Sequence, residues 1–127
     1  MVREEKKEEA ERYLNKGKSF YSAALEEFAK ERYDVSVFSA SQAIILTNDA
    51  LCIAFLGKRP SKDHREAIEL HLQASAGKKN KKEDVKDALE KRGKYGYTEK
   101  TASKEEARKF LITTKRFLDW IEEKIGK

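Results

Sequence analysis

The hydrophobic pattern of this chain is dominated by one stretch, residues 34–56, which reads DVSVFSASQAIILTNDALCIAFL. Only Asp34 and Asp49 bring charge into it, although charged residues make up 40% of the protein. Apolar side chains fall on nearly every side of a helical wheel, so a helix here must be covered by other elements over most of its surface. We therefore predict a buried central helix, with Asp34 as its N-cap residue.

A membrane-spanning helix is the competing interpretation of the same stretch, because about 20 apolar residues suffice to cross a bilayer. Serines, Gln42, Asn48 and Asp49 interrupt the apolar run. An acidic side chain inside a membrane is energetically unfavourable. The core helix is therefore the better interpretation, and we expect no contact with a membrane.

An amphipathic stretch precedes the central helix. Residues 3–31 place apolar side chains three and then four positions apart, with Glu and Lys between them, which is typical of a helix. The link at residues 31–34 is short, so we predict that the two helices pack as antiparallel neighbours. Gly17 costs about 1 kcal/mol relative to Ala within a helix, and we interpret it as a point of close approach between helices.

The central helix is expected to end at Gly57, a favourable residue just beyond a helix C-terminus, and Pro60 prevents its continuation. A third helix is then predicted to start at Ser61 or Asp63 and to run to about Ala76. Its apolar stripe shares one face with His64 and His71.

Two more helices are predicted in the C-terminal part. Residues 77–82 form a basic loop, and a short helix follows over residues 83–92, with acids in its first turn as the helix dipole favours. Residues 93–102 are expected to form a loop that carries two tyrosines. Ser103 and Glu106 form a capping box that opens the last helix.

No segment shows strand-like alternation or an internal repeat. We predict one domain over residues 1–127, with an all-α fold: an antiparallel up-and-down helical bundle of four main helices plus a short fifth. The charged N-terminus has no signal-peptide pattern, and the one cysteine, Cys52, lies in the core stretch, so we expect a cytoplasmic protein. Abundant Lys and Glu with scarce Gln and Asn indicate a thermophilic source.

The net charge of +5 is unevenly distributed along the chain. Residues 1–57 have a balance of −2 and residues 58–127 a balance of +7. This asymmetry is compatible with an anionic partner such as RNA or a nucleotide phosphate. Glu and Lys also interleave throughout, which is typical of a solvated surface with many ion pairs. The simpler interpretation is therefore the solvated surface.

The chain contains no phosphate-binding glycine loop, paired-cysteine metal site or HExxH motif, and no inward Glu-x-x-His pairs, so we expect neither a metal nor a cofactor. His64 and His71 are the only side chains that ordinarily titrate near neutrality, and they share one face of the third helix. His71 continues the apolar stripe, which favours a structural role. For His64, an acid–base role and a structural role both stay open.

Three further polar or aromatic residues stand out. Asp49 lies within the apolar helix, where a carboxylate is costly unless it is paired. We expect it to hold a basic residue or to line a subunit contact. Tyr95 and Tyr97 fit either stacking on a nucleobase or closing one end of the bundle.

Two segments together resemble the HEPN domains, which are small prokaryotic helical bundles named for nucleotide binding. They are SASQAIILTNDALCIAFLGKRPSKDH at residues 39–64 and RGKYGYTEKTASKEEARKFLITTKRFLDWIEEKI at residues 92–125. In that family an Arg-to-Tyr stretch precedes a capped final helix. The resemblance covers nearly the whole chain. It implies a homodimer, in many cases paired with a minimal nucleotidyltransferase as a toxin–antitoxin system.

Catalytically active members of this family are metal-independent ribonucleases in which four to six residues separate an Arg from a His. Arg59 and His64 have that spacing, and so do Arg65 and His71. The resemblance implies that the Arg stabilises phosphate charge and that the His moves the proton of the 2′-hydroxyl. In active members the motif is usually near the last helix, which contains no histidine here.

We therefore expect a non-catalytic module that dimerises and binds a nucleotidyltransferase partner, a nucleotide or RNA. The alternative is a ribonuclease that uses one of the two Arg–His pairs. For a bound nucleotide or RNA, the expected contacts are Lys62, Arg92, Tyr95 and Tyr97.

Overall fold

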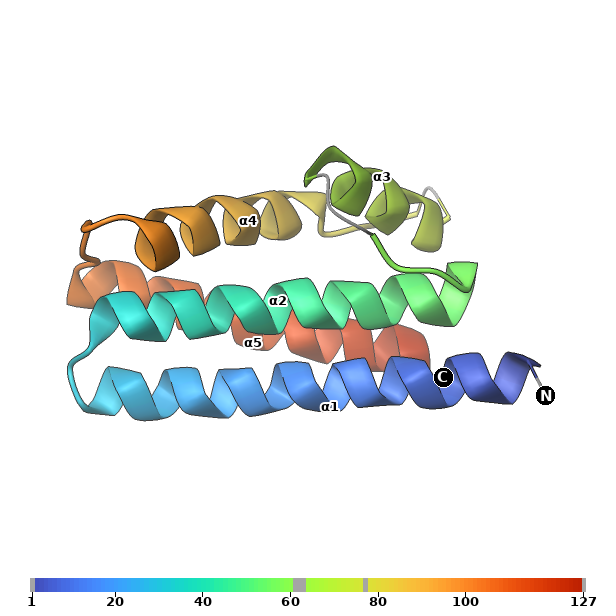
Figure 1. Cartoon of the computed structure of the whole chain (residues 1–127), viewed down its shortest axis with the longest axis horizontal. Coiled ribbons are helices and arrows are strands. Elements are labelled where there is room, and N and C mark those ends of the chain that lie inside the picture. Colours follow the sequence, from blue (N-terminus) through green and yellow to red (C-terminus); the bar gives the residue numbers. More distant parts are fainter. Residues whose placement is uncertain (1, 61–63, 77, 127) are drawn as a thin grey trace.

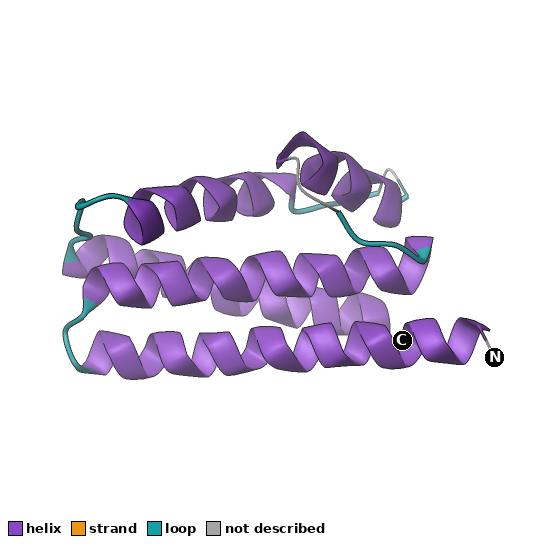
Figure 2. Ribbon diagram, in the orientation of Figure 1, coloured by secondary structure: helices purple, strands orange, loops and turns teal. Residues whose placement is uncertain are grey.

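The computed structural model describes residues 2–60, 64–76 and 78–126, and all regular secondary structure in these ranges is helical (Figure 2). The helices are α1 (Val2–Ala29), α2 (Tyr33–Leu56), α3 (His64–Ala74), α4 (Lys82–Tyr97) and α5 (Lys104–Gly126). Figure 1 shows the four long helices side by side, with successive long helices running in opposite directions, and the short α3 over the start of α4. The predicted all-α, up-and-down bundle is confirmed.

Helix α2 is the centre of the bundle, since it contacts each of the other four helices. Val37, Ile44 and Leu51 are among its fully buried side chains. By length and composition it is the one candidate membrane span in the described part of the chain, but most of its surface is covered by the bundle. The predicted buried central helix is confirmed.

The N-terminus of α2 differs from the prediction. The helix begins at Tyr33, and the capping position is Arg32, which makes no side-chain capping hydrogen bond. Asp34 lies in the first turn of the helix, so its prediction as the N-cap is wrong. The ring of Tyr33 packs edge-on against Phe28 of α1, 5.4 Å between centroids. This contact holds Tyr33 against the core, where it can start the helix two residues earlier than predicted.

The C-terminus of α2 follows the sequence. Gly57 has a φ of 74°, in the left-handed region, and its N–H donates to the carbonyl of Ile53 at 3.0 Å. Glycine adopts this conformation without a steric penalty. The predicted helix stop is therefore confirmed, and the chain turns back over α2 towards α3 (Figure 1).

Gly17 marks a close approach of α1 to α2. A Cβ atom built on it would collide with the Thr47 side chain and would lie 3.1 Å from the carbonyl oxygen of Ala43. The interpretation of this glycine as a point of close helix approach is confirmed. The contact between the two backbones offsets the helix propensity that Gly17 lacks.

The structure corrects the extent of α4. Residues 93–97, predicted as loop, continue the helix, and the short helix of the bundle is α3, with 11 residues. The ring of Phe38 fills the space beside Gly96, where a Cβ would come within 2.5 Å of it. Tyr95 is buried, and its hydroxyl donates to the Glu106 carboxylate of α5 at 2.7 Å. These tertiary contacts stabilise a helix that the glycines alone would end.

The remaining helix ends agree with the prediction only in part. The hydroxyl of Ser103 accepts a hydrogen bond from the N–H of Glu106 at 3.0 Å, which confirms the cap of α5. The predicted starts of α3 at Ser61 and Asp63 lie outside the described residues. Helix α3 ends at Ala74 rather than near Ala76, because Ala76 has a left-handed φ of 55°.

Candidate functional site

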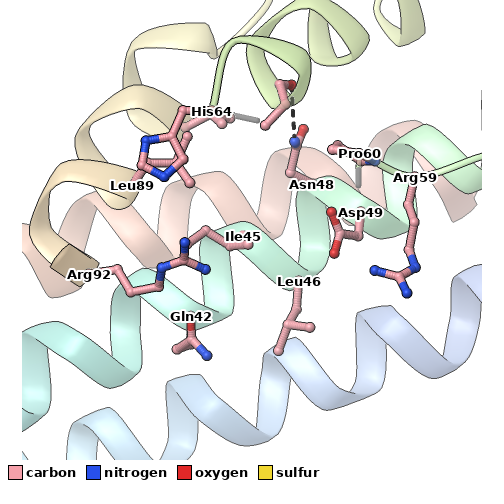
Figure 3. Close-up of a pocket in the computed structure, with 12 residues that line it drawn as sticks. Gln42, Ile45, Leu46, Asn48, Asp49, Arg59, Pro60, His64, Leu89 and Arg92 are labelled. Atoms are coloured by element: carbon pink, nitrogen blue, oxygen red, sulfur yellow. Dashed lines mark hydrogen bonds between the residues drawn. The ribbon is translucent and has the colours of Figure 1, made fainter. Parts of the chain in front are cut away.

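A cavity of about 230 Å³ lies between the middle of α2, the start of α3 and one face of α4 (Figure 3). It is bordered by side chains from three helices and from the loop after α2. Its lining residues are Gln42, Ile45, Leu46, Asn48, Asp49, Arg59, Pro60, His64, Ala67, Val85, Leu89 and Arg92. The cavity thus combines an apolar floor with two arginines, one histidine and one carboxylate.

Helical spacing brings these side chains together. Gln42, Ile45 and Asp49 are three and four positions apart on α2, so they share one face of that helix. On α4, Leu89 and Arg92 share a face in the same way. The left-handed turn at the end of α2 reverses the chain, and this brings the Arg59–Pro60 segment back over the helix (Figure 3).

Two guanidinium groups border the cavity. Arg59 is exposed, and its guanidinium carbon lies 5.4 Å from the centroid of the Tyr13 ring on α1. Arg92 is half-buried and reaches into the cavity from α4 (Figure 3). Among the residues that the structure describes, neither arginine has an ion-pair partner within 4.0 Å, so both are available to an anionic ligand.

Other basic side chains of the C-terminal half are paired at the surface. Arg108 of α5 donates two hydrogen bonds to the Glu105 carboxylate, at 2.9 and 2.6 Å, and Lys115 is 2.7 Å from Asp119. Exposed pairs of this kind contribute about 0–1 kcal/mol each. These pairs agree with a solvated, ion-paired surface. The two arginines at the cavity differ from them, because they form no ion pair among the described residues.

Asp49 is the most unusual group in the cavity. Its side chain comes from the core helix, 9% of the residue is exposed, and its carboxylate points towards the cavity in Figure 3. Within the described ranges no residue donates a hydrogen bond to this carboxylate or forms an ion pair with it. Burial raises the pKa of Asp49 to about 7, against the lowering effect of Arg59 and Arg92. The arginines are therefore near enough to act on its charge without neutralising it.

A second buried acceptor lies on the same helix face. The side-chain oxygen of Gln42 is buried, and it has no hydrogen-bond partner in the described part of the chain. Leaving a buried oxygen unpaired costs about 1–3 kcal/mol. Of the two, the Asp49 carboxylate is the acceptor that a ligand with N–H or O–H groups could reach, because the Gln42 oxygen is closed off from solvent.

A buried hydrogen-bond network supports the back of the cavity. Nε2 of His71 accepts from the Lys81 backbone N–H at 2.9 Å, so the ring proton is on Nδ1, which donates to Asn48 Oδ1 at 2.8 Å. The Asn48 amide nitrogen donates to the Ala67 carbonyl at 3.4 Å. Burial lowers the pKa of His71 to about 4. His71 is therefore neutral at physiological pH and orients Asn48.

The comparison with protein families identifies the fold family. The family model for the HEPN domain matches residues 10–124, which cover most of the chain. The chain belongs to the HEPN domain family. The resemblance carried by the two sequence segments is thereby confirmed, and HEPN domains are associated with ribonuclease and toxin–antitoxin roles. A search of curated proteins finds no significant match to this sequence.

The structure brings together three of the residues that the sequence singles out in this HEPN domain. Arg59, His64 and Arg92 all line the same cavity, although Arg92 is far from the other two along the chain. His64 is the first described residue of α3, is exposed, and borders the cavity opposite the wall formed by α2 (Figure 3). The expected ligand contact Lys62 lies outside the described residues.

The second Arg–His pair is separated by the fold. Arg65 is exposed on α3 and does not line the cavity, whereas His71 is fully buried with both ring nitrogens in hydrogen bonds. A proton-transfer role needs a histidine that can reach a ligand. The geometry of this HEPN domain therefore favours the structural interpretation of His71.

The two tyrosines lie away from the cavity. Tyr95 is buried, and burial, together with its hydrogen bond to Glu106, raises its pKa to about 12. It fits the interpretation in which a tyrosine closes one end of the bundle. Tyr97 is 78% exposed at the last position of α4 and lines none of the cavity.

The sequence did not single out Gln42 and Asn48 as cavity residues. Asp49 was expected to hold a basic residue or to line a subunit contact, but no basic residue among the described ones forms an ion pair with it, and the subunit contact stays a prediction. A signal for them exists, because the three polar residues interrupt an otherwise apolar helix, and Gln42 and Asp49 are two turns apart on one face. Polar residues on a core helix point to a cavity or to an internal hydrogen-bond network.

The cavity can bind an anion and can exchange protons. Guanidinium groups bind phosphate oxygens through paired N–H donors. The exposed imidazole of His64 can accept or donate a proton. In residues 2–60, 64–76 and 78–126 no group of three or more His, Cys, Asp or Glu side chains could hold a metal ion.

Proposed function

We propose that this HEPN domain binds one nucleotide unit, free or within RNA, in the cavity bordered by Arg59, Arg92 and His64. The observation that carries the proposal is that two arginines from different elements border one cavity, and neither has an ion-pair partner among the described residues. A guanidinium group binds phosphate oxygens bidentately, so each arginine offers a place for a phosphate at its own side of the cavity (Figure 3).

The size and composition of the cavity support a small ligand. Its volume of about 230 Å³ is below the range of about 300–1,000 Å³ typical of drug-sized pockets. It therefore suits a single nucleotide whose phosphate reaches the exposed Arg59, rather than a longer stretch of enclosed RNA. The apolar side chains of Ile45, Val85 and Leu89 supply a surface on which a base can lie.

Calorimetric titration with nucleoside monophosphates at low salt tests the proposal. Arg59→Ala and Arg92→Ala are each expected to weaken binding by at least about tenfold, because each removes charge-assisted hydrogen bonds. Arg116→Ala, an exposed arginine of α5 outside the cavity, is the matched control and should bind as the unaltered protein does. Wild-type protein that binds no nucleotide at millimolar concentration would refute the proposal.

The same proposal places this domain in a toxin–antitoxin-like assembly as a non-catalytic homodimer that binds a nucleotidyltransferase. Family membership supports this context, since HEPN domains have toxin–antitoxin roles. Sedimentation of the purified protein and co-purification with a nucleotidyltransferase encoded beside it are the tests. A strictly monomeric protein that retains no such enzyme would count against this part.

A second candidate function is a metal-independent ribonuclease. It is favoured by one observation, that Arg59 and His64 of the Arg-x4-His spacing border the same cavity. His64 would take the proton of the 2′-hydroxyl, and Arg59 would stabilise the charge that develops on the phosphate. RNA cleavage in EDTA that disappears in His64→Ala would establish this function. Cleavage that survives His64→Ala would come from another source.

A cytoplasmic location and a thermophilic source complete the proposal. They are supported by the Lys- and Glu-rich composition and by the burial of α2 in the bundle. A melting temperature within the range of about 45–65 °C typical of mesophile domains would contradict the thermophilic source.

A further inference from the structure

The cavity contains more than an anion-binding site requires. Arginines suffice to hold a phosphate, yet the α2 wall also presents the Asp49 carboxylate, and the buried side-chain oxygen of Gln42 lies behind the same wall. Both groups are hydrogen-bond acceptors, and neither has a donor among the described residues. A phosphate alone would be repelled by Asp49 and would leave both acceptors unsatisfied.

A simple cation does not fit the cavity either. Arg59 and Arg92 border it and together outweigh the single negative charge of Asp49. The ligand that satisfies all of these groups carries an anionic part for the arginines and a separate edge of N–H donors for the carboxylate. A nucleotide has both parts, with its phosphate at one end and its base at the other.

The donor pattern of the bases then selects among nucleotides. An ionised carboxylate offers two acceptor oxygens side by side. Guanine has two adjacent donors on its Watson–Crick edge, the ring N1–H and the exocyclic amine. Adenine and cytosine each place a donor beside an acceptor, and uracil has one ring donor between two acceptors. Guanine therefore forms two parallel hydrogen bonds with a carboxylate, while the other bases form one.

We propose that Asp49 is a specificity-determining residue that reads guanine through its Watson–Crick edge, so that this domain prefers guanosine nucleotides. The inference rests on the proposed nucleotide-binding function and assigns the base that the site prefers. Gln42 lies two turns, about 10 Å, from Asp49 along α2. Its side-chain oxygen is closed off from solvent, so the contact with the base is assigned to Asp49 alone.

Asp49 is suited to this role by where the fold holds it. The residue is nine-tenths buried on a core helix, so its carboxylate position is set by the packing of α2 rather than by a mobile loop. The network of His71 and Asn48 holds the adjacent wall of the cavity. Hydrogen bonds from guanine would supply the donors that burial withholds from the carboxylate.

Titration calorimetry at pH 8, where the Asp49 carboxyl with its pKa of about 7 is mostly ionised, tests the inference. The ligands are GMP, AMP, CMP, UMP and ribose 5-phosphate. We expect GMP to bind at least about tenfold more tightly than the other nucleotides. Asp49→Asn replaces one acceptor by a donor, so it should remove the preference and weaken GMP binding relative to ribose 5-phosphate at least about tenfold. Ribose 5-phosphate should bind at least as tightly as before, because the variant loses the negative charge that repels a phosphate.

The control variants separate this inference from the proposed function. Asp119→Asn, an exposed carboxylate of α5 paired with Lys115, should leave the preference for GMP unchanged. Arg59→Ala should weaken all the nucleotides and ribose 5-phosphate alike. Equal binding of all four nucleotides, or a preference for GMP that persists in Asp49→Asn, would overturn the guanine assignment and leave the proposed function intact. Failure of every phosphate ligand to bind would overturn both.

Discussion

Replacement of Asp49 by Asn is expected to stabilise the protein, and to do so more at high pH than at low pH. Burial raises the pKa of this carboxyl from 3.8 to about 7 in the folded state. Between these values the folded protein holds the proton that the unfolded chain releases. The stability that the protein has with Asp49 protonated is therefore fully present below pH 3.8, and it is lost as the pH rises through about 7.

The size of the effect follows from the two pKa values. They differ by roughly three, and each factor of ten in proton affinity is worth about 1.4 kcal/mol, so the ionised carboxylate lowers the unfolding free energy at pH 8 by about 4 kcal/mol. At pH 5 the loss is about 2 kcal/mol, because the folded-state carboxyl is still protonated. Asn has nearly the same size and cannot ionise, so it avoids both losses.

Urea unfolding of the ligand-free protein at pH 5 and pH 8 measures this directly. We expect Asp49→Asn to gain about 2 kcal/mol at pH 5 and about 4 kcal/mol at pH 8. Asp119→Asn, in which an exposed ion pair is lost, should change stability by less than about 1 kcal/mol at either pH. A gain that does not grow with pH, or a loss of stability at pH 8, would refute the assignment of Asp49 as a buried, unpaired carboxylate.

Three further predictions concern one packing contact and two sets of buried or partly buried hydrogen bonds. Gly17→Ala should lower the unfolding free energy by about 1–3 kcal/mol, because the added methyl collides with Thr47. Gly93→Ala, with open space around it, should raise the unfolding free energy by about 0.5–1 kcal/mol. If urea unfolding showed the same change in stability for Gly17→Ala and Gly93→Ala, the close helix approach at Gly17 would be contradicted. His71→Ala leaves two buried hydrogen-bond partners unsatisfied and should cost about 3 kcal/mol or more in the same assay; a melting temperature within a degree of wild type would argue against the network. Tyr95→Phe removes the hydroxyl bond to α5 and should cost about 1 kcal/mol, and an unchanged unfolding midpoint would count against that bond.

If the first prediction holds, the carboxylate lowers stability where a leucine or asparagine would not. Natural proteins tolerate such losses mainly where a residue serves function. The stability measurement and the nucleotide titration of Asp49→Asn therefore address the same residue from two sides. If Asp49→Asn is more stable and no longer prefers guanosine nucleotides, the same carboxylate both lowers stability and selects the base.

The helical class and the central helix could be predicted from the sequence because both depend on local patterns. An apolar run with few charges must be covered, and Gly57 stops the helix through a conformation that glycine adopts readily. Gly17 could likewise be interpreted from sequence, since a glycine within a strongly helical pattern needs a packing reason.

Contacts between distant residues decided the parts that local patterns misjudge. Gly96 indicated a loop, but the ring of Phe38 fills the space beside it and the bond from Tyr95 to Glu106 ties the last turn of α4 to α5. The start of α2 also depends on a tertiary contact, because Tyr33 packs on α1. Propensity is a small term of about 1 kcal/mol per residue, and such contacts exceed it.

The candidate site divides in the same way. The sequence by itself determined the four-residue spacing of Arg59 and His64 and the presence of a carboxylate in an apolar helix. Only the tertiary structure placed Arg92 of α4 at the same cavity and left the Asp49 and Gln42 oxygens without donors among the described residues. The reason is physical: spacing along a helix is set by local geometry, whereas the pairing of a buried polar group depends on every element that packs around it.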